Sequence, residues 1–439
     1  MIKRHTFENG FQLVYQKSTQ SIPLTSVHVL CNVGSAYEID PIRGASHLVE
    51  HMCFKGTKEH GKARTMLLEY NKVGAYINAY TEKRVTGYTL MCDDAHAAKC
   101  INVLSDMILQ ASFSKKEFDK EQHVVVEENI RTKDNHEYML RKALDKIYFC
   151  GSSYEHPIDI LSYHPTPTHL KYEDIYQWYK WFYRPANLVC SIVSNLSFTE
   201  ICKIIKTSVF MKTDTLSTAS VYLYPKLVLY PINKHFIYHK KLNSALILHV
   251  GFRTCSYYDD DKYLVKILQH VLNGFSGRLF TTFRTKRGLT YHSSAHSTFH
   301  EHMGYFNFFI QTDPSKLIID GKGKPGIIPT LLDLIEDLIK NGITSEELVV
   351  AKGNCKGKQL IKLQDIDSIA EYNGLQVILK QTDVPFQQMF DKHIAPITCQ
   401  QVNTMIRKYI TYKNLVVGIV HKDTIPKNKI ESLFHEAKW

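Results

Sequence analysis

A short stretch near the N-terminus carries side chains that could bind a metal ion. Residues 44–57 read GASHLVEHMCFKGT, with His47, Glu50 and His51 in a run otherwise typical of a helix. Residues four apart on a helix project from nearly the same line, so the two imidazoles can hold one ion at about 2.0–2.1 Å. Glu50 borders the same face, where its carboxylate can reach a water on the metal without itself binding the metal. A solvated, charged helix face is the simpler interpretation of this motif alone.

A second stretch could supply the third ligand that a catalytic zinc site needs. In KEQHVVVEENIRTKDN, residues 120–135, Glu121 and Glu128 lie seven apart on one helical stripe. Glu127 lies about 100° off that stripe. A carboxylate from this second helix would complete a site of two histidines and one glutamate. The alternative is again a solvated acidic helix face, which this stretch alone does not exclude.

Composition and charge exclude several classes of protein. The 439 residues are 44% hydrophobic and 22% charged, which is typical of a globular chain with more than one domain. The sequence has no apolar run of the ~18 residues that a membrane span needs, and no apolar N-terminal region. Ten scattered cysteines predict free thiols in a reducing compartment, so we expect a cytoplasmic protein. The net charge of +11 is spread over short basic segments, which makes nucleic-acid binding an unfavoured alternative.

Two segments in different halves of the chain resemble each other. Residues 178–195 read WYKWFYRPANLVCSIVSN, and residues 405–422 read MIRKYITYKNLVVGIVHK. Each has an aromatic-rich helix end, a polar turn with Asn187 or Asn414, and a buried-looking strand. Their separation is about half the chain length, which predicts one internal duplication.

The pattern of strand-like and helix-like runs predicts the fold class. Both halves mix hairpin-like strand pairs with long helical stretches, which favours α+β over a doubly wound parallel sheet. We expect two homologous α/β-sandwich halves, each with helices packed on an antiparallel-rich sheet. The predicted division is a metal-binding half over 1–212, a linker over 213–234 and a second half over 235–439.

Four motifs together resemble the pitrilysin and insulinase-type zinc metallopeptidases, in the branch of mitochondrial processing peptidase. H-x-x-E-H is the inverted form of the H-E-x-x-H zinc helix. ASHLVEHMCFKGT and KEQHVVVEEN resemble the family's two metal helices, and EYNKVGAYINAYTEKRVTGY resembles its strand with Asn-Ala. LNGFSGRLFTTFRTKRGLTYHSSAHS resembles the signature of its C-terminal half. The resemblance runs over about residues 5–425, nearly the whole chain.

The resemblance implies a zinc endopeptidase that cleaves extended or unfolded peptides inside a closed chamber. It implies that His47, His51 and Glu128 bind one Zn²⁺ per chain. By the same resemblance Glu50 is the general base, and Glu121 is a supporting carboxylate behind the ligands.

The resemblance also assigns residues to substrate. Asn78 and Ala79 would lie on an exposed edge strand, where an extended peptide adds as a further strand. Arg284 and Tyr291 would bind the substrate and stabilise the oxyanion, and are the remaining catalytic candidates. A simple turn residue, an ordinary salt bridge and a packed aromatic are the simpler interpretations of Asn78, Arg284 and Tyr291.

The resemblance bears on assembly as well. Full-length members carry four homologous domains and this chain has two, so we expect a homodimer, or a heterodimer with a related subunit. In the homodimer, the second half of one chain would complete the zinc site of the other. Three alternatives to the peptidase stay open. They are a catalytically silent structural subunit of the same fold, a basic nucleic-acid-binding protein, and a different metal enzyme with the same motif.

Overall fold

The computed structural model describes most of the chain. The described residues are 2–39, 42–132, 134–158, 170–212, 230–232, 234–240, 246–379, 385–422 and 424–437. They form two compact units, each assembled from three segments of chain. The first unit comprises Met1–Thr132, Ser152–Lys226 and Ile361–Pro385, and the second unit comprises Lys133–Gly151, Leu227–Leu360 and Phe386–Trp439.

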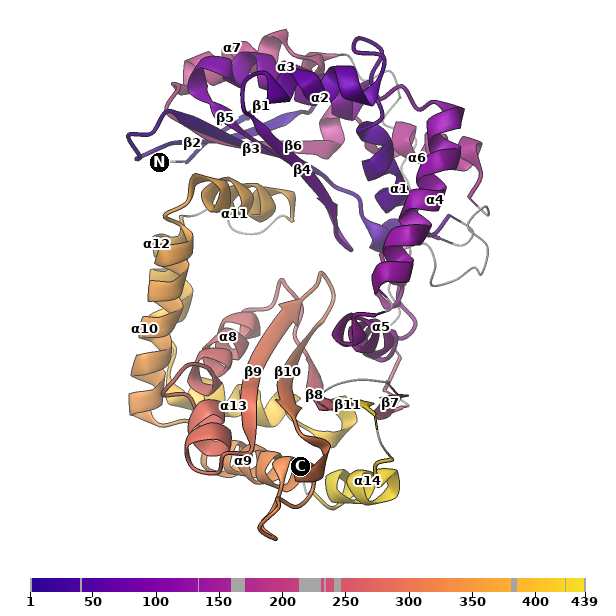
Figure 1. Cartoon of the computed structure of the whole chain (residues 1–439). Coiled ribbons are helices and arrows are strands. Elements are labelled where there is room, and N and C mark those ends of the chain that lie inside the picture. The colour runs from indigo at the N-terminus through magenta and orange to yellow at the C-terminus, as the bar shows by residue number, and fades with distance from the viewer. Residues whose placement is uncertain are drawn as a thin grey trace. The chain divides into compact units, whose positions relative to one another are not determined.

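The first unit is built on a six-stranded sheet in the order β1-β2-β6-β3-β5-β4. Its strands are β1 Ile2–Thr6, β2 Gln12–Lys17, β3 Leu24–Cys31, β4 Tyr76–Thr81, β5 Thr86–Asp93 and β6 Leu188–Ser194. Its helices are α1 Ala45–Cys53, α2 Ala63–Asn71, α3 Ala97–Leu109, α4 Lys115–Thr132, α6 Tyr172–Phe182, α7 Phe198–Thr207 and α11 Ile366–Ile378. Helices α2, α3 and α7 cover one face of the sheet, and α11 covers the other (Figure 1).

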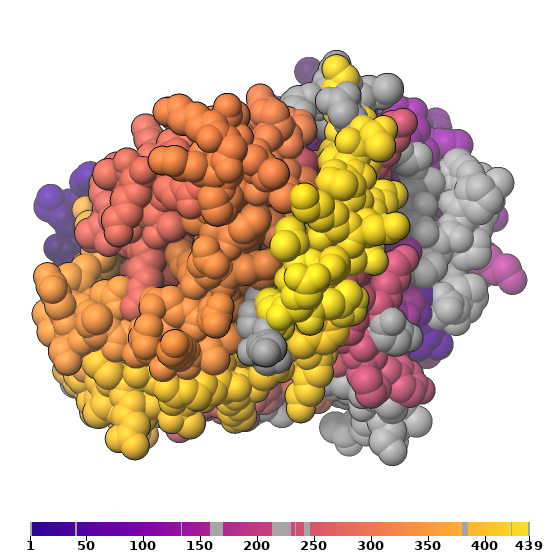
Figure 2. Space-filling view, turned by 90° about the horizontal axis from the view of Figure 1, so that it is seen from below, coloured from indigo at the N-terminus to yellow at the C-terminus, as the bar shows by residue number. Residues whose placement is uncertain are grey.

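The second unit is built on a five-stranded sheet in the order β7-β11-β8-β10-β9. Its strands are β7 Phe236–Lys240, β8 Leu246–Thr254, β9 Thr290–Phe299, β10 Gly304–Thr312 and β11 Leu415–His421. Its helices are α5 His136–Tyr148, α8 Asp261–Leu272, α9 Ile327–Asn341, α10 Ser345–Lys362, α12 Phe386–Met389, α13 Cys399–Tyr409 and α14 Lys427–Glu436. Figure 2 shows the C-terminal α14, in yellow, beside α9, which it contacts.

The two sheets repeat the same topology. The series β2-β6-β3-β5-β4 corresponds to β7-β11-β8-β10-β9, and in each series the first pair is parallel and the others are antiparallel. The two similar segments become α6 followed by β6 and α13 followed by β11, each joined by a short turn that contains Asn187 or Asn414. The predicted fold class, two homologous halves with helices packed on antiparallel-rich sheets, is confirmed.

The two units exchange one helix each. α11 comes from the second half of the sequence but packs on β3 and β6, and α5 comes from the first half but packs on β11. Glycine permits the close approach, since a Cβ at Gly374 of α11 would lie 2.9 Å from Leu30 Cδ1. A Cβ at Gly418 of β11 would likewise lie 2.8 Å from Leu140 Cδ1 of α5.

The compact units therefore depart from the contiguous division 1–212 and 235–439 at two segments, Lys133–Gly151 and Ile361–Pro385. Most of the predicted linker, including Pro225, lies outside the described residues. All ten cysteines are free thiols, as the sequence predicts. Within the described ranges, every helix is too short or too polar to cross a membrane.

Candidate metal centre and active site

The first unit brings together the three predicted metal ligands. His47 Nε2 lies 3.3 Å from His51 Nε2, and Glu128 Oε2 lies 3.8 Å from the first nitrogen and 3.5 Å from the second. Ligands at about 2.0–2.1 Å around a tetrahedral zinc ion stand about 3.3–3.4 Å apart. The triangle of donor atoms is therefore close to the size that zinc requires, and two nitrogens with one carboxylate oxygen suit its chemistry.

The local sequence explains how α1 presents its histidines. Leu48, Val49 and Met52 are fully buried and fix one face of the helix in the core of the first unit. His47 and His51 lie on the opposite face and are half-buried. The helix is thus anchored by apolar residues that alternate with its polar residues at helical spacing.

Glu38 holds the start of α1. Its buried carboxylate accepts hydrogen bonds from the backbone N–H groups of Gly44 at 2.6 Å and Ser46 at 2.8 Å. Burial raises the pKa of Glu38 to about 7, against the opposing effect of these bonds. Sequence reasoning did not select Glu38, because nothing local to it shows that the chain folds back onto the helix end.

Glu121 supports His51 from behind. Its Oε2 lies 3.1 Å from His51 Nδ1, and its Oε1 forms an ion pair with Lys55 Nζ at 2.7 Å. A hydrogen bond from Nδ1 to the carboxylate places the imidazole proton on Nδ1. The unprotonated Nε2 then faces the other two metal-ligand atoms, His47 Nε2 and Glu128 Oε2. Burial acts to raise the pKa of Glu121, but His51 and Lys55 outweigh it and lower that pKa, so the carboxylate is ionised.

Glu50 lies beside the donor triangle and is held by the sheet. Its Oε2 accepts a 2.6 Å hydrogen bond from Thr81 Oγ1, at the end of β4. Burial raises the pKa of Glu50, against the opposing effects of Thr81 and His51. A raised pKa suits a group that must gain and release a proton near neutral pH. Thr81 lies in the stretch that resembles the family's strand with Asn-Ala, but only the contact between α1 and β4 links it to Glu50.

The strand that carries Thr81 also carries Asn78 and Ala79. Among the described residues β4 is the last strand of its sheet and pairs with β5 alone, with Asn78 opposite Thr89 and Ala79 opposite Tyr88. Asn78 is exposed, and its Oδ1 accepts a 2.9 Å hydrogen bond from the Ala79 N–H. The strand is therefore an edge strand, the position that the resemblance implies for Asn78 and Ala79, and it runs directly to Thr81, which holds Glu50.

The second unit brings Arg284 and Tyr291 together. The Arg284 guanidinium lies 4.7 Å from the centre of the Tyr291 ring and 5.2 Å from that of Phe280. Arg284 belongs to a π-helical segment, Phe280–Thr285, and Tyr291 is the second residue of β9, with 84% of its surface exposed. These cation–π contacts hold the guanidinium near both rings while its N–H groups stay able to donate.

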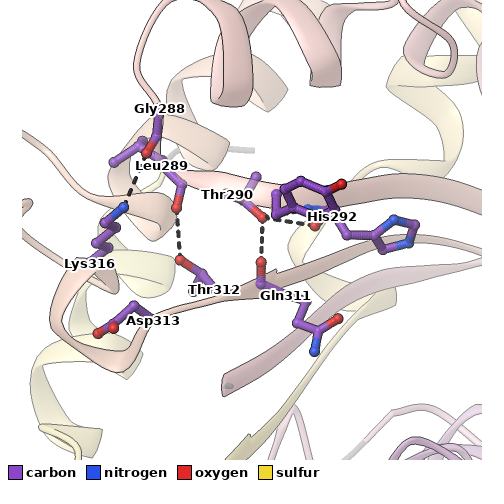
Figure 3. A pocket seen from close by; sticks show the side chains of 9 residues that line it. Gly288, Leu289, Thr290, His292, Gln311, Thr312, Asp313 and Lys316 are labelled. Carbon is purple, nitrogen blue, oxygen red and sulfur yellow. Dashed lines mark hydrogen bonds between the residues drawn. The ribbon is translucent and has the colours of Figure 1, made fainter. Parts of the chain in front are cut away.

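Tyr291 lies between two hollows of the second unit. One, of about 200 Å³, is also lined by Phe280 and Arg284. The other, of about 520 Å³, lies where β9 and β10 meet (Figure 3). There Thr312 Oγ1 donates to the Leu289 carbonyl at 2.9 Å, and Lys316 Nζ donates to the Gly288 carbonyl at 3.1 Å, which fixes the wall of the hollow.

Comparison with known proteins places this geometry in a family. The sequence profile of Insulinase (Peptidase family M16) matches residues 13–159, and that of the Peptidase M16 inactive domain matches residues 169–355. The chain belongs to the insulinase family of peptidases, family M16. The family recognised in the sequence is confirmed, whereas the roles of the individual residues stay predictions.

Individual relatives match different shares of the chain. It is 26% identical over 412 residues to the "Uncharacterized zinc protease YmxG" of Bacillus subtilis, across 94% of this chain and 96% of that one. It is 25% identical over 202 residues to the mitochondrial-processing peptidase subunit beta of Caenorhabditis elegans, across 45% and 42% of the two chains. A protease from Helicobacter pylori shares the fold, with a TM-score of 0.85 and 20% identity across 96% and 99% of the chains.

Proposed function

We propose that this M16 chain is a zinc-dependent endopeptidase that hydrolyses peptide bonds of extended or unfolded peptides inside a closed chamber. The observation that carries the proposal is the donor triangle of His47, His51 and Glu128, with the Glu50 carboxylate held beside it by Thr81. The proposal assigns one zinc ion to each chain. The free thiols support a cytoplasmic location for this activity.

The three ligands would hold zinc and leave a fourth position open. When bound, zinc would supply a Lewis acid that polarises the scissile carbonyl and lowers the pKa of a water molecule toward about 7. Glu121 keeps His51 in the tautomer that presents Nε2, and so holds the binding geometry ready. The neighbouring Lys55 fixes Glu121 in turn.

Glu50 would move the proton. Thr81 donates to Oε2, which leaves Oε1 to take a proton from the attacking water and later deliver it to the leaving amine. The raised pKa of Glu50 suits both steps, because a carboxylate that gives up its proton too readily cannot protonate the amine. The hydrogen bond from Thr81 orients the carboxylate without neutralising it.

The edge strand β4 would bind the substrate. Its outer backbone groups can pair with an extended peptide. The enzyme would therefore select substrates first by their extended conformation and only then by their side chains. Asn78 and Ala79 would align the peptide, and the strand would lead it toward Glu50. Most backbone groups of a folded domain are already paired within its own helices and sheets, so it offers little extended chain for this pairing. Efficient cutting of a stable folded protein would contradict this part of the proposal.

Cleavage of a random peptide library, read by mass spectrometry with and without a zinc chelator, tests the activity. We expect cuts in unstructured peptides that vanish with the chelator and return when zinc is restored. A protein that binds zinc in this site and cuts nothing would support a silent structural subunit instead. Salt-sensitive DNA binding without peptidase activity would support the nucleic-acid alternative.

Arg284 and Tyr291 would offset the charge that develops on the scissile carbonyl, by donating N–H and O–H groups. We propose that they act across the interface of a homodimer, so that each active site takes residues from both chains. A heterodimer with a related subunit would meet the same requirement.

Mixed dimers test this shared site. Glu50→Gln and Tyr291→Phe should each damage the pure homodimer, whereas an isolated dimer of one chain of each kind should recover about half of the wild-type activity. In that dimer one site has both native residues and the other has both defects. Mixed dimers that stay as inactive as the parents would place both residues in one chain's site, and the peptidase assignment would still stand.

A further inference from the structure

The second unit contains a counterpart of the metal helix. KILQHV, residues 266–271 of α8, aligns with HLVEHM, residues 47–52 of α1, and in both helices the third and sixth residues are buried. In Figure 1, α8 lies between α10 and β9 within its unit, as α1 lies between α4 and β4. Lys266 therefore takes the place of His47, and His270 takes the place of His51.

The helix that supplies the third ligand has a counterpart as well. α4 and α10 are both 18 residues long, and the buried Phe118 and Val125 of α4 match the buried Leu348 and Cys355 of α10. In this register Lys358 takes the place of Glu128. Ala351 occupies the position of Glu121.

A hydrogen bond confirms the register of α8. Ser297 Oγ, on the edge strand β9, donates to Gln269 Oε1 at 2.6 Å. The same contact joins Thr81, on the edge strand β4, to Glu50 at 2.6 Å. Gln269 thus replaces the general base, and the second unit keeps the scaffold of the site while each of its three carboxylates is lost.

The counterpart of the metal centre, on α8 and α10, carries positive side chains, whereas the metal centre of the first unit carries carboxylates. The side chains of Lys266 and Lys358 both reach solvent, and within the described ranges neither forms an ion pair with a carboxylate. Burial by the surrounding protein lowers the pKa of the Lys266 ammonium. Burial and the two lysines lower the pKa of His270 to about 4, so the imidazole is neutral at pH 7. Two ammonium groups and a neutral imidazole repel a metal cation and attract an anion.

We propose that Lys266, His270 and Lys358 form an anion site that binds a carboxylate of the peptide substrate, from an acidic side chain or the C-terminus. Its identity as a substrate site rests on the proposed function, whereas its affinity for anions does not. Lysine recognises a carboxylate as a mobile point charge with three donors, which tolerates peptides of different sequence. Inorganic phosphate offers the same chemistry and is the competing ligand.

Binding of two labelled peptides to the Glu50→Gln chain tests the proposal, because this variant should leave the peptides intact. One peptide carries glutamates near a free C-terminus, and the other carries glutamines and an amidated C-terminus. Replacing both Lys266 and Lys358 by alanine should raise the Kd of the acidic peptide about tenfold at low salt, through loss of two charge-assisted contacts. The Kd of the neutral peptide should change less than about twofold.

Lys340→Ala is the matched control, since Lys340 is an exposed lysine of α9 in the same unit and the variant also loses positive charge. It should leave both Kd values within about twofold, and the acidic preference of the parent chain should shrink in high salt. Circular dichroism confirms folding, and glutamine at both lysines replaces alanine if the alanine variant unfolds. Equal effects on both peptides, or no effect, would overturn the proposal.

Inorganic phosphate separates the two sources of anion. It should compete with the acidic peptide on the parent chain and lose that effect when both lysines are replaced. Phosphate binding without any preference for the acidic peptide would overturn the assignment to substrate. Because uncut peptides are bound in this assay, the lysine effect can appear even if hydrolysis is never found. Hydrolysis with no lysine effect would refute the anion site alone.

Discussion

The metal centre of the first unit and its counterpart in the second unit share a scaffold and differ in charge. Both combine two helices with the edge strand of a sheet, and both keep a hydroxyl that donates to the second polar residue of the motif, Glu50 or Gln269. The first place presents imidazoles and carboxylates, and the second presents lysines and an amide. Duplication therefore preserved packing, and the chemistry diverged at the few side chains that packing does not constrain.

The largest functional difference between the two places is expected at the general base, Glu50, where the second unit has Gln269. Glu50→Gln should lower peptide turnover by about 10²–10⁴-fold while zinc content stays unchanged, since the amide cannot accept the proton. Glu127→Gln is the matched control, because Glu127 is exposed on the face of α4 beside the ligand. Full turnover in a zinc-loaded Glu50→Gln protein would remove Glu50 from the mechanism.

The next largest effect concerns the third ligand. Glu128→Gln should weaken zinc binding more than about 100-fold, beyond the range of changes to supporting residues, whereas Glu127→Gln should not alter it. Metal content by atomic emission and competition with a chelator measure both. A larger loss at Glu127 would shift the register of α4 by one residue.

Removal of the supporting carboxylate should have a smaller effect. Glu121→Gln should weaken zinc binding by about 10–100-fold, because the amide holds the His51 Nδ1 proton less strongly. Zinc titration against a chelator measures the change. Lys120→Gln on the same helix is the control, and an equal loss there would show that general charge on α4 controls affinity.

The smallest expected effect is the gain of a second zinc ion when the metal-binding side chains are restored in the second unit. Replacing Lys266 by histidine and Lys358 by glutamate recreates the donor set of the first unit and should raise zinc content from one to two ions per chain. The matched variant Lys266→His with Lys358→Gln should stay near one, because it lacks the carboxylate. Failure of the first variant to gain zinc, while folded, would mean that the scaffold alone does not set donor geometry.

Local spacing explains which parts of the site could be predicted from sequence. His47, Glu50 and His51 are joined by one helical turn, and Glu121 and Glu128 by two turns, so their shared faces follow from helix geometry. Glu38 and Thr81 could not be predicted, because their contacts with α1 exist only after the chain folds. Lys266 and Lys358 look like ordinary polar positions of amphipathic helices until the duplicated units are compared.

The same limit applies to the fold. Residue periodicity predicts helices and strands, and the repeat of helix, turn and strand reveals the duplication. It cannot show which sheet a helix covers, because an apolar stripe fits either of two similar sheets. The exchange of α5 and α11 could therefore not be predicted from the sequence. Which sheet each helix covers depends on close approaches such as that of Gly374 to Leu30.

That exchange has a consequence for synthesis on the ribosome. The strands of the first unit are complete at Ser194, but α11, which shields one face of their sheet, begins only at Ile366. At about 5–20 residues per second, the nascent chain exposes this face for several seconds or longer. Domains usually mature in order as they emerge, whereas here the first unit stays incomplete until most of the second unit has been synthesised. A chain released early would present an unshielded apolar surface to chaperones and proteases.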